Sequence, residues 1–375
     1  MDRVCKILQL GLSENYAGTE SYVMNQYRTI DKNLINYDFM DMLDPEKKIC
    51  CYDEIVSQGC KIWKIPFPRR KYNILKSYFN MTKWMFLHRK DYDAVVYNMN
   101  NHHVVYPLLV ARIFGVKKVI AHSHNSEYEG KISFFKNIFY KINKFILNLS
   151  VTDRWACSIV AGKFLFGNKD FLIIKNGINL RRFLYSEINR KKIRQEYNIG
   201  NQILIGHVGR LCYQKNQEYL LDIFIDVCRK RDDFILMCVG DEPENFKKDW
   251  QLQRKIKDNN LEKKIIFAGK HKNINEYYSA FDCFVLPSRF EGLPLVGIEA
   301  QAAGLKCFFS NKITVESNPT GLVEFIDIAE KDISRWSDKI INANFYDREN
   351  KMEVLREKGF DLMDQVKIIT EYYRK

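Results

Sequence analysis

The sequence predicts an α/β protein made of two doubly wound parallel sheets, and three observations support this prediction. Short apolar runs alternate with segments of helical periodicity along most of the 375 residues. A fresh apolar run begins the alternation again at Ile203–Val208, after a polar stretch at Leu184–Ile199 that we expect to be the linker. The length also suits two cores of roughly 150 to 200 residues each.

The first half contains seven apolar runs short enough to be strands, separated by longer segments with helical spacing. We expect strands at Val4–Leu10, Tyr37–Met42, Lys61–Pro66, Ala94–Asn98, Lys118–His122, Arg154–Cys157 and Phe171–Ile174. We expect helices at Thr19–Ile30, Tyr72–Arg89, His103–Phe114, Ser133–Leu149 and Ile159–Phe166.

The second half repeats this pattern on a smaller scale. We expect strands at Ile203–Val208, Phe234–Val239, Lys264–Phe267, Asp282–Leu286 and Lys306–Phe309, and helices at Gln217–Lys230, Phe246–Asp258 and Leu295–Ala303. Residues 1–190 and 191–358 should therefore form two Rossmann-like domains. Because parallel sheets bind ligands beyond the carboxyl ends of their strands, the expected site is a cleft between the domains.

The net charge of +13 is concentrated in the first half of the chain. Residues 1–190 carry 29 Lys and Arg against 17 Asp and Glu, whereas residues 191–375 carry 30 against 29. Two basic segments, at 61–90 and 131–144, are also rich in aromatic residues. Cations interleaved with aromatic rings suit an anionic bilayer surface, so we expect membrane contact there. The residues predicted to make it are Arg69, Arg70, Lys71, Lys131, Phe134, Phe135 and Lys136.

Two other interpretations of the basic segments stay open. One is a solvated basic face above a buried aromatic stripe. The other, which we do not expect, is nucleic-acid binding.

The first residues lack the apolar core of a secretory signal, and no window is apolar enough to span a membrane. The ten cysteines form no C-x-x-C pair, which favours reduced thiols over disulfides or a zinc site. We expect a cytoplasmic protein, peripheral at the inner face of the plasma membrane.

The stretch 284–304, FVLPSRFEGLPLVGIEAQAAG, carries the clearest indication of chemistry. A strand ends at Leu286, and a helix begins at Leu295 after Leu293 and Pro294. The free N–H groups and the dipole of the first helical turn form an anion site that suits a diphosphate. Glu291 and Glu299, eight residues apart, can accept hydrogen bonds from sugar hydroxyls and from a ribose diol. By themselves, two such glutamates are equally well explained as surface carboxylates.

The run from Glu291 to Glu299 matches the E-x7-E signature of the family 4 retaining glycosyltransferases, which have the GT-B fold. Further segments resemble that family, and the enzymes that build capsular polysaccharides and exopolysaccharides are most similar. These segments are LGLSENYAGTESYVMNQYR near the start, AHSHN at 121–125, IKNGINLRRF at 174–183, GRLCYQKNQ at 209–217 and FDLMDQVKIITEYY at the end. The resemblance also implies that residues 359–375 form a helix crossing back to the first domain.

The resemblance implies a role for each matching residue of the second domain. Glu291 contacts the donor sugar, and Glu299 contacts the nucleotide ribose. Arg210 and Lys215 match a G-R-x4-K element and neutralise the leaving diphosphate. With two fixed cations and a helix N-terminus, no metal or other cofactor is expected.

In the first domain, Gly18 follows the first strand and would let a phosphate or sugar approach the backbone. His124 is expected beside the donor sugar, donating a hydrogen bond to its hydroxyls. Lower-ranked candidates for acceptor or sugar contact are His122, Asn125 and Asn176. At Asn179 this chain replaces the aspartate usual in the family.

The predicted function is transfer of a hexosyl group, with retention of configuration, from a nucleotide-diphosphate sugar to a glycan acceptor. The acceptor is expected to be lipid-linked, in cell-surface polysaccharide synthesis. Two alternatives stay open: a nucleotide-sugar epimerase or phosphorylase on the same fold, and a non-catalytic protein that binds polyanions or membranes.

Overall fold

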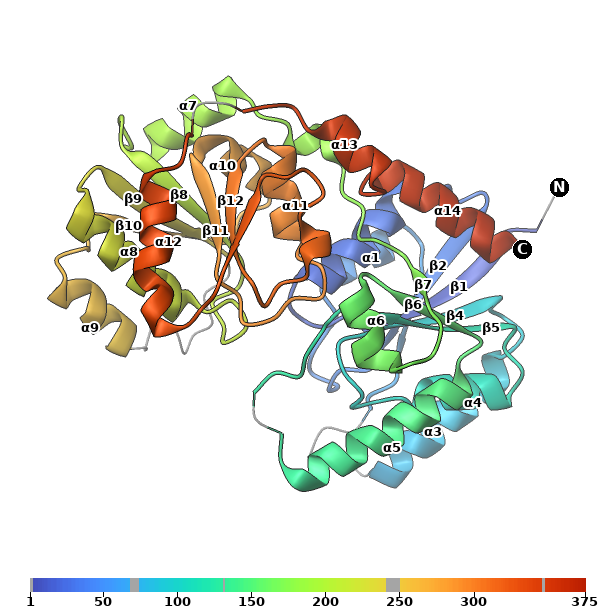
Figure 1. Ribbon diagram of the computed structural model, residues 1–375. Helices are drawn as coiled ribbons and strands as arrows, with labels where there is room; N and C mark the ends of the chain where they lie inside the picture. The colour runs from blue at the N-terminus through green and yellow to red at the C-terminus, as the bar shows by residue number, and fades with distance from the viewer. Residues whose placement is uncertain (1–2, 68–73, 131, 241–249, 346–347) are drawn as a thin grey trace. The chain divides into compact units, whose positions relative to one another are not determined.

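The computed structural model describes residues 3–67, 74–130, 132–240, 250–345 and 348–375, and the chain divides into two compact units. Unit 1 comprises residues 1–177 and 362–375, and unit 2 comprises residues 178–361. Each unit has a parallel sheet with helices packed on it (Figure 1). The predicted fold class, α/β with two Rossmann-like domains, is confirmed.

Unit 1 has a seven-stranded parallel sheet in the order β3-β2-β1-β4-β5-β6-β7. The order reverses direction between β1 and β4, and such a reversal opens a crevice at the carboxyl ends of the strands. The strands are β1 Cys5–Leu10, β2 Ile35–Asp41, β3 Ile62–Lys64, β4 Ala94–Met99, β5 Lys118–Ser123, β6 Asp153–Ala156 and β7 Leu172–Ile173.

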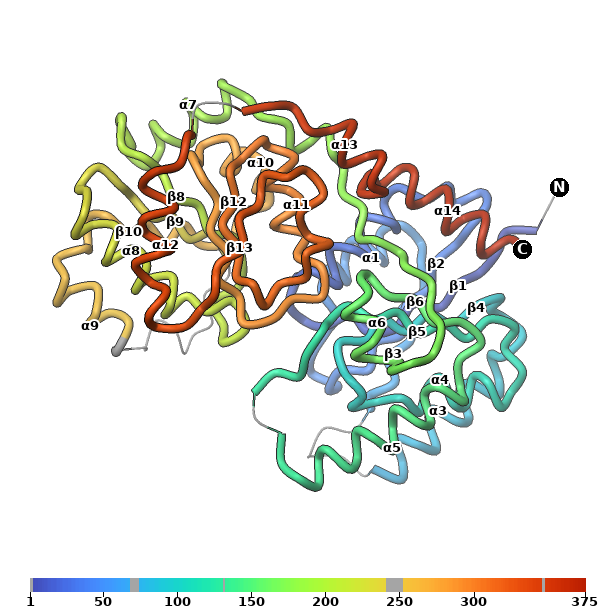
Figure 2. The backbone as a smooth tube through the Cα atoms, viewed as in Figure 1, coloured from blue at the N-terminus to red at the C-terminus, as the bar shows by residue number. Residues whose placement is uncertain are grey.

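Helices cover both faces of this sheet. One core contains buried side chains of α1 and α14, and the other contains those of α3, α4, α5 and α6. Figure 2 follows the chain back to unit 1 at α14, where Cys5 Sγ lies 3.5 Å from the Tyr373 carbonyl oxygen. The helices are α1 Gly18–Thr29, α2 Tyr52–Ser57, α3 Ile74–His88, α4 Tyr106–Ile113, α5 Phe134–Ser150, α6 Ile159–Phe166 and α14 Leu362–Arg374.

Unit 2 repeats the topology with a six-stranded parallel sheet, β10-β9-β8-β11-β12-β13, which reverses direction between β8 and β11. Its strands are β8 Ile203–Val208, β9 Phe234–Val239, β10 Ile265–Gly269, β11 Cys283–Leu286, β12 Lys306–Ser310 and β13 Val323–Ile326. Its α-helices are α7 Glu187–Glu196, α8 Gln217–Lys230, α9 Trp250–Asp258, α10 Ile274–Ala280, α11 Leu295–Ala302, α12 Ile333–Ile341 and α13 Met352–Glu357; η1 Leu180–Phe183, η2 Val315–Ser317 and η3 Glu330–Asp332 are short 3-10 turns.

The segment expected to be a linker is part of unit 2, so that prediction was wrong. Residues 184–199 include α7, whose Ile193 is fully buried. Arg190 and Arg194 of this helix bind Asp282 at 2.7 and 3.1 Å, at the start of β11. The charged residues hid the helix, because two of its arginines bind the largely buried Asp282 instead of facing water. The units divide at residues 177/178 and 361/362, whereas the predicted boundaries were 190/191 and 358/359.

Candidate functional site

At the reversal point of unit 2, hydrogen bonds join the loop after β8 to the loop after β11. The Asn216 amide donates to the Pro287 carbonyl at 3.1 Å, and the Arg289 backbone N–H donates to the Gln214 carbonyl at 2.8 Å. The Gln214 side chain donates in return to the Phe290 carbonyl at 3.1 Å. The two loops predicted to bind the donor therefore form one connected structure at the carboxyl edge of the sheet.

Lys215 and Glu291, one from each loop, form an ion pair with Lys215 Nζ 2.7 Å from Glu291 Oε1. Both side chains are largely buried, with exposed fractions of 14% and 9%. The Lys215 stem lies over Gly209, where an added Cβ would be 3.0 Å from Lys215 Cε. The structure thus brings together one predicted cation and one predicted carboxylate.

Arg210 lies on the same loop as Lys215, but its side chain is exposed and has no ion pair among the described residues. Its backbone is fixed by Gln217, which sequence reasoning missed. The Gln217 amide donates to the Arg210 carbonyl at 2.9 Å and accepts from the Cys212 N–H at 3.2 Å. Nε2 of the buried His207 lies 3.1 Å from the same amide nitrogen. Gln217 therefore fixes the loop while leaving the Arg210 guanidinium accessible.

Helix α11 begins immediately after the Glu291 loop and leaves its N-terminus uncapped. Pro294, at the N-cap, supplies no side-chain hydrogen bond, and the first turn contains no acidic residue. Leu293 and Leu295 are each only 5% exposed, so a ligand would meet their backbone and not their side chains. Gly297 allows close packing on β12, since a Cβ there would lie 2.7 Å from the Phe309 ring. The first turn keeps free donors for an anion.

Glu299 is buried in α11 and is positioned by Tyr278, a residue that sequence reasoning also missed. The Tyr278 hydroxyl donates to Glu299 Oε2 at 2.8 Å and to the Val296 carbonyl at 3.1 Å. Burial raises the pKa of Glu299 to about 7, against the lowering effects of the Tyr278 hydroxyl and the positive charges of Arg182 and Lys215. Near neutral pH this carboxyl is therefore divided between its ionised and protonated forms.

In unit 1, the loop after β1 is held by buried Glu20. Its Oε1 accepts from the Ser13 N–H at 2.9 Å and the Ser13 hydroxyl at 2.7 Å, and its Oε2 accepts from the Ala17 N–H at 3.1 Å. At the first position of α1, Gly18 has open space where a Cβ would lie. Packing within unit 1 does not require glycine there, which leaves room for a ligand.

His124 follows β5, and its ring is oriented by Asn98 of β4, with Nε2 3.0 Å from Asn98 Oδ1. The Asn98 amide nitrogen donates to Gln9 and Leu10, so Oδ1 must be an acceptor and His124 Nε2 carries the proton. Burial lowers the pKa of His124 to about 3, so the ring is neutral. With its Nε2 proton directed at Asn98, the ring has no free N–H for the predicted donor role, and Nδ1 is a buried acceptor without a partner among the described residues.

The three lower-ranked candidates of unit 1 have different surroundings. His122 is 0% exposed, packs edge-on against Tyr22 at 4.9 Å and cannot touch a substrate in this structure. Asn125 is half-buried, and its side-chain oxygen accepts from the Ser126 N–H at 3.0 Å. Asn176 is 4% exposed, and its Oδ1 has no partner within the described parts of the chain.

The loop that leads away from His124 is attached to α5 through Tyr128. The Tyr128 ring stacks on Tyr140 of α5, with centroids 4.5 Å apart and an interplanar angle of 13°. Its hydroxyl lies 2.5 Å from His102 Nδ1, in the loop after β4. Asn143 of α5 donates to the His102 carbonyl at 2.7 Å. The inner side of α5 therefore supports the loops after both β4 and β5.

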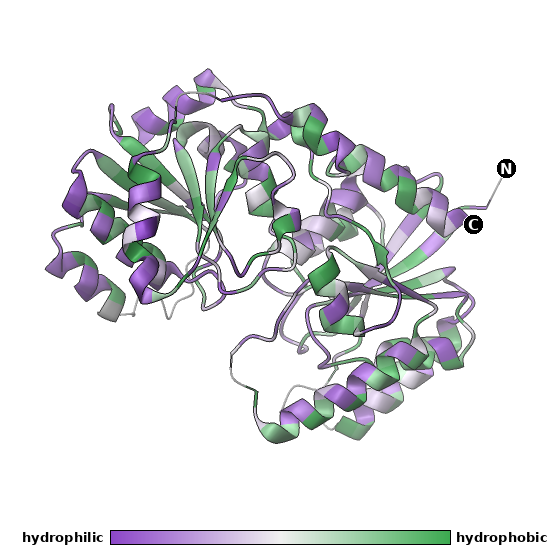
Figure 3. Cartoon of the chain, in the orientation of Figure 1, coloured by the Kyte–Doolittle hydropathy of each residue, from purple (hydrophilic) through white to green (hydrophobic). Residues whose placement is uncertain are grey.

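The outer sides of α3 and α5 are apolar and exposed, which reverses the usual arrangement of a surface helix. Neither helix contains an acidic residue, and both lie on the same face of the unit 1 sheet, with α4 packed against each (Figures 1 and 3). We call the following set the apolar face: Ile74, Leu75, Phe79, Phe86 and Leu87 of α3, and Phe134, Phe135, Ile138, Phe139, Ile142, Phe145 and Leu149 of α5, all of them 42% to 81% exposed.

Lysines lie among these apolar side chains. Lys76, Lys83, Lys136 and Lys141 are exposed on the two helices. The predicted membrane residues Phe134, Phe135 and Lys136 thus lie at the surface, whereas Arg69, Arg70, Lys71 and Lys131 lie outside the described residues. No helix in the described parts of the chain combines the length and hydropathy needed to cross a bilayer.

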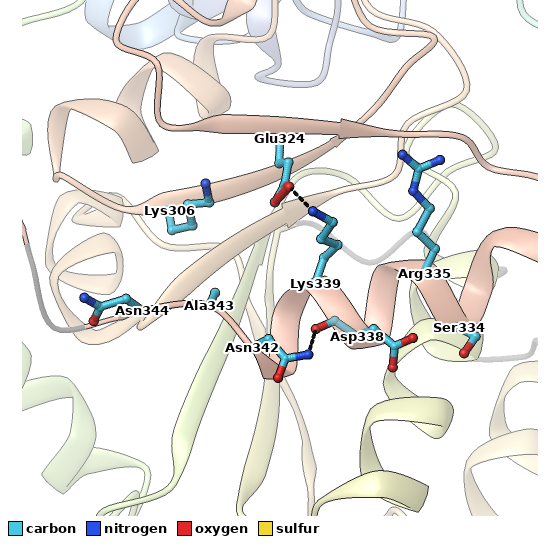
Figure 4. Close-up of a pocket in the computed structure, with 9 residues that line it drawn as sticks. All are labelled: Lys306, Glu324, Ser334, Arg335, Asp338, Lys339, Asn342, Ala343 and Asn344. Atoms are coloured by element: carbon cyan, nitrogen blue, oxygen red, sulfur yellow. Dashed lines mark hydrogen bonds and ion pairs between the residues drawn. The ribbon is translucent and has the colours of Figure 1, made fainter.

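A hollow of about 790 Å³ in unit 2 lies away from these motifs (Figure 4). It is lined by residues of β12, β13 and α12 and contains the Lys339–Glu324 ion pair at 2.7 Å. Lys306 is the first residue of β12, so the hollow is at the amino end of the strands. A nucleotide site is expected at the opposite edge, where the E-x7-E motif lies.

The sheets, the reversal points and the E-x7-E loop define a glycosyltransferase of the GT-B type, similar to family 4. Residues 189–342 match the family described as "Glycosyl transferases group 1". The chain is 28% identical to glycosyltransferase EpsF of Bacillus subtilis, over 98% of this chain and 96% of that protein. It is 26% identical to UDP-Gal:alpha-D-GlcNAc-diphosphoundecaprenol alpha-1,3-galactosyltransferase of Escherichia coli, over 85% of each.

Among solved structures, the chain resembles Anabaena HepE in complex with UDP and glucose. The TM-score is 0.79 at 16% identity, over 98% of this chain and 99% of that one. This likeness concerns the fold. The predicted glycosyltransferase function is confirmed by the family match and by the relatives, which do not support an epimerase, a phosphorylase or a non-catalytic binder.

Proposed function

We propose that this glycosyltransferase moves a hexosyl group from a uridine-diphosphate sugar to a lipid-linked glycan acceptor, with retention of configuration, in cell-surface polysaccharide synthesis. The Lys215–Glu291 pair carries the proposal, because it sets a cation and a carboxylate side by side before the uncapped start of α11. The E. coli relative uses UDP-galactose and a diphosphoundecaprenol-linked acceptor, as its name states. The uridine base, the hexosyl group, retention, the acceptor and the roles of individual residues all belong to the proposal.

In the donor complex, the diphosphate binds the first turn of α11 and the two cations of the β8 loop. Lys215 turns from Glu291 toward a phosphate oxygen, and exposed Arg210 reaches the same group. Glu291 then accepts hydrogen bonds from the hydroxyls of the hexose. Glu299 accepts from the ribose diol, which favours its ionised form.

Transfer with retention brings the acceptor hydroxyl to the face from which the diphosphate leaves. The hydroxyl proton passes to an oxygen of the departing diphosphate, the glycosidic C–O bond to the diphosphate breaks, and the acceptor oxygen bonds to the anomeric carbon. Arg210, Lys215 and the N-terminus of α11 stabilise the charge that develops on the leaving group. The proposal assigns this electrostatic role to the protein and to no metal ion.

On the acceptor side, the apolar face rests on the inner, anionic leaflet of the plasma membrane. The Phe, Ile and Leu side chains enter the interface, while the lysines among them meet lipid phosphates. Each lysine near such a surface contributes roughly 1 kcal/mol. The lack of acidic residues on both helices supports this choice over a solvated face.

Calorimetry with UDP and with the mono- and diphosphates of the other bases tests the donor assignment. We expect UDP to bind the wild-type protein, and Arg210→Gln to weaken binding of the diphosphate much more than binding of UMP. EDTA should leave transfer unchanged. Equal weakening of both nucleotides would contradict the diphosphate role, and loss of activity in EDTA that added Mg²⁺ restores would contradict the metal-free scheme.

Vesicle flotation tests the membrane assignment separately. Wild-type protein should float with vesicles containing phosphatidylglycerol and remain unbound with phosphatidylcholine alone. Phe135→Ser combined with Phe145→Ser should abolish flotation, whereas Ile188→Ser, at an 80% exposed position of unit 2, should have no effect. Flotation of the double variant equal to wild type would exclude the apolar face as the contact.

A further inference from the structure

Two adjacent thiols, Cys50 and Cys51, lie outside the proposed donor site and have no role in it. Neither forms a disulfide, and both are partly exposed, at the start of α2 in unit 1. Cys51 has a left-handed backbone with φ of 58°. Cys212 and Cys228 are the other partly exposed cysteines, and the remaining six are buried. Cys50 and Cys51 thus form the one adjacent pair among the ten thiols.

The Cys51 sulfur lies beside a cation. Arg28 Nη2 is 4.0 Å from Cys51 Sγ, and the same guanidinium holds Glu54 through two bonds of 2.6 and 2.7 Å. A hydrogen bond from Cys50 lowers the pKa of Cys51 to about 7, with Arg28 helping, while burial and the negative charge of Glu54 oppose the shift. A thiol of ordinary pKa near 8.5 would be only a few per cent ionised at neutral pH.

This cluster is connected to the loop after β1, which ends at Gly18. The Cys50 backbone N–H donates to the Ser13 carbonyl at 2.8 Å, and Arg28 Nη1 lies 3.4 Å from the Tyr16 hydroxyl. Lys47 pairs with Glu14 at 2.9 Å. Ser13 and Tyr16 of the β1 loop are therefore tied to Cys50 and to Arg28, and Glu14 is tied to the nearby Lys47.

We propose that Cys51 is a thiol-modification site, at which its Sγ exchanges with low-molecular-weight disulfides and thereby loosens the loop after β1. The Cys51 thiolate attacks one sulfur of the reagent, a new S–S bond forms, the old one breaks, and the departing thiolate takes the electron pair and a solvent proton. The adduct occupies the space beside Arg28 and removes the negative charge from it. The Arg28 guanidinium, still paired with Glu54, is thereby displaced from the Tyr16 hydroxyl.

Exchange with the chromogenic disulfide DTNB at pH 7 tests the site independently of any transferase activity. We expect one fast thiol, about fivefold or more faster than the others, with a rate midpoint near pH 7. Cys51→Ser should remove this phase, whereas Cys212→Ser and Cys228→Ser should retain it. Cys50→Ala should slow it and Cys50→Ser should preserve it, because serine still offers a hydrogen-bond donor. Peptide mapping of modified wild-type protein gives the same assignment without a variant.

The proposal fails if mapping places the first adduct elsewhere, or if the fast phase persists in Cys51→Ser. Hydrogen exchange tests the link to the loop: amides 13–17 should exchange faster in the Cys51 adduct than in unmodified protein, and reduction should reverse the change. Unchanged protection of these amides would overturn the coupling. If the proposed sugar transfer proved wrong, neither the thiol exchange with DTNB nor the hydrogen exchange of the loop would change. The modification site and the proposed function are therefore tested separately.

Discussion

Lys215 Nζ lies 2.7 Å from Glu291 Oε1, which fixes the side chains of both residues before any donor arrives. The ion pair keeps both groups desolvated and close together, but Lys215 must leave Glu291 to reach a phosphate of the donor. A phosphate must compete with Glu291 for Lys215. The carboxylate therefore opposes binding of the nucleotide alone, while it favours the hexose.

Glu291→Gln should separate these two effects. Without the carboxylate charge, Lys215 is available to the diphosphate, so UDP should bind several-fold more tightly, while kcat should fall by roughly a hundredfold. Calorimetry and initial rates measure the two quantities. Glu276→Gln is the matched control, because Glu276 pairs with Lys192 at the same 2.7 Å elsewhere in unit 2. Weaker UDP binding in Glu291→Gln would refute the competition.

Glu299→Gln should change how stability depends on pH. The folded-state pKa of about 7 lies above the unfolded value near 4.5, so the folded protein holds this proton more tightly. The contribution of Glu299 to stability is complete below pH 4.5 and is lost as pH rises to about 7. Urea unfolding at pH 5 and pH 8 should therefore show a smaller loss of stability in Glu299→Gln than in wild type.

Glu276→Gln is again the control, because the pKa of Glu276 is shifted in the opposite direction to that of Glu299. The hydrogen bond from Lys192 lowers the pKa of Glu276, so its stabilising effect is present above the unfolded pKa and is lost as pH falls. This variant should lose stability at pH 8 relative to wild type. If the stability of the two variants changed with pH in the same way, the assigned protonation of Glu299 would be ruled out.

The ring of Tyr278 is needed for packing, whereas its hydroxyl is needed to position Glu299. Tyr278→Phe keeps the contacts with Phe183, Phe281 and Phe284, so the protein should fold. The lost hydrogen bond should weaken UDP binding about tenfold, equivalent to roughly 1.4 kcal/mol. Tyr277→Phe, whose hydroxyl contacts Tyr197 at 3.2 Å, should bind UDP normally. Equal affinities of the two variants would remove Tyr278 from the site.

Gly18→Ala tests whether the open space at the start of α1 is used by a ligand. The structure offers no obstacle to the methyl group, so the melting temperature should stay the same or rise slightly. If a substrate uses this space, KM should rise several-fold. Gly200→Ala, where a Cβ meets only the end of Gln202 at 3.4 Å, should leave KM unchanged. Normal kinetics in Gly18→Ala would exclude close approach at this turn.

Strands with unbroken apolar runs were predicted well from the sequence, because both of their faces are buried. The predicted bounds of the strands Ile203–Val208 and Phe234–Val239 match the structure at both ends, as do those of the helix Gln217–Lys230. Elements whose burial depends on partners distant in sequence were missed. Helix α7 needs Asp282 to neutralise its arginines, and the edge strand β13, at Val323–Ile326, pairs on one side only.

The candidate site shows the same difference between features set by local sequence and features set by contacts distant in sequence. The E-x7-E spacing identified Glu291 and Glu299, but no local pattern marks Tyr278, which positions Glu299, or Gln217, which fixes the Arg210 loop. The tautomer of His124 likewise depends on Asn98, which is 26 residues away. Sequence identifies the groups with chemical function, while the contacts that orient them appear only once the chain is folded.

Helix α5 attaches to unit 1 through its inner side, where Tyr140 and Asn143 hold the loops after β4 and β5 and Leu147 is buried in the core. Its outward residues contribute little to the core, so they are free to change independently of it. A variant in which every exposed Phe, Ile and Leu of α5 is replaced by Gln or Ser should therefore keep the native fold, and it would be a tractable reagent for crystallisation.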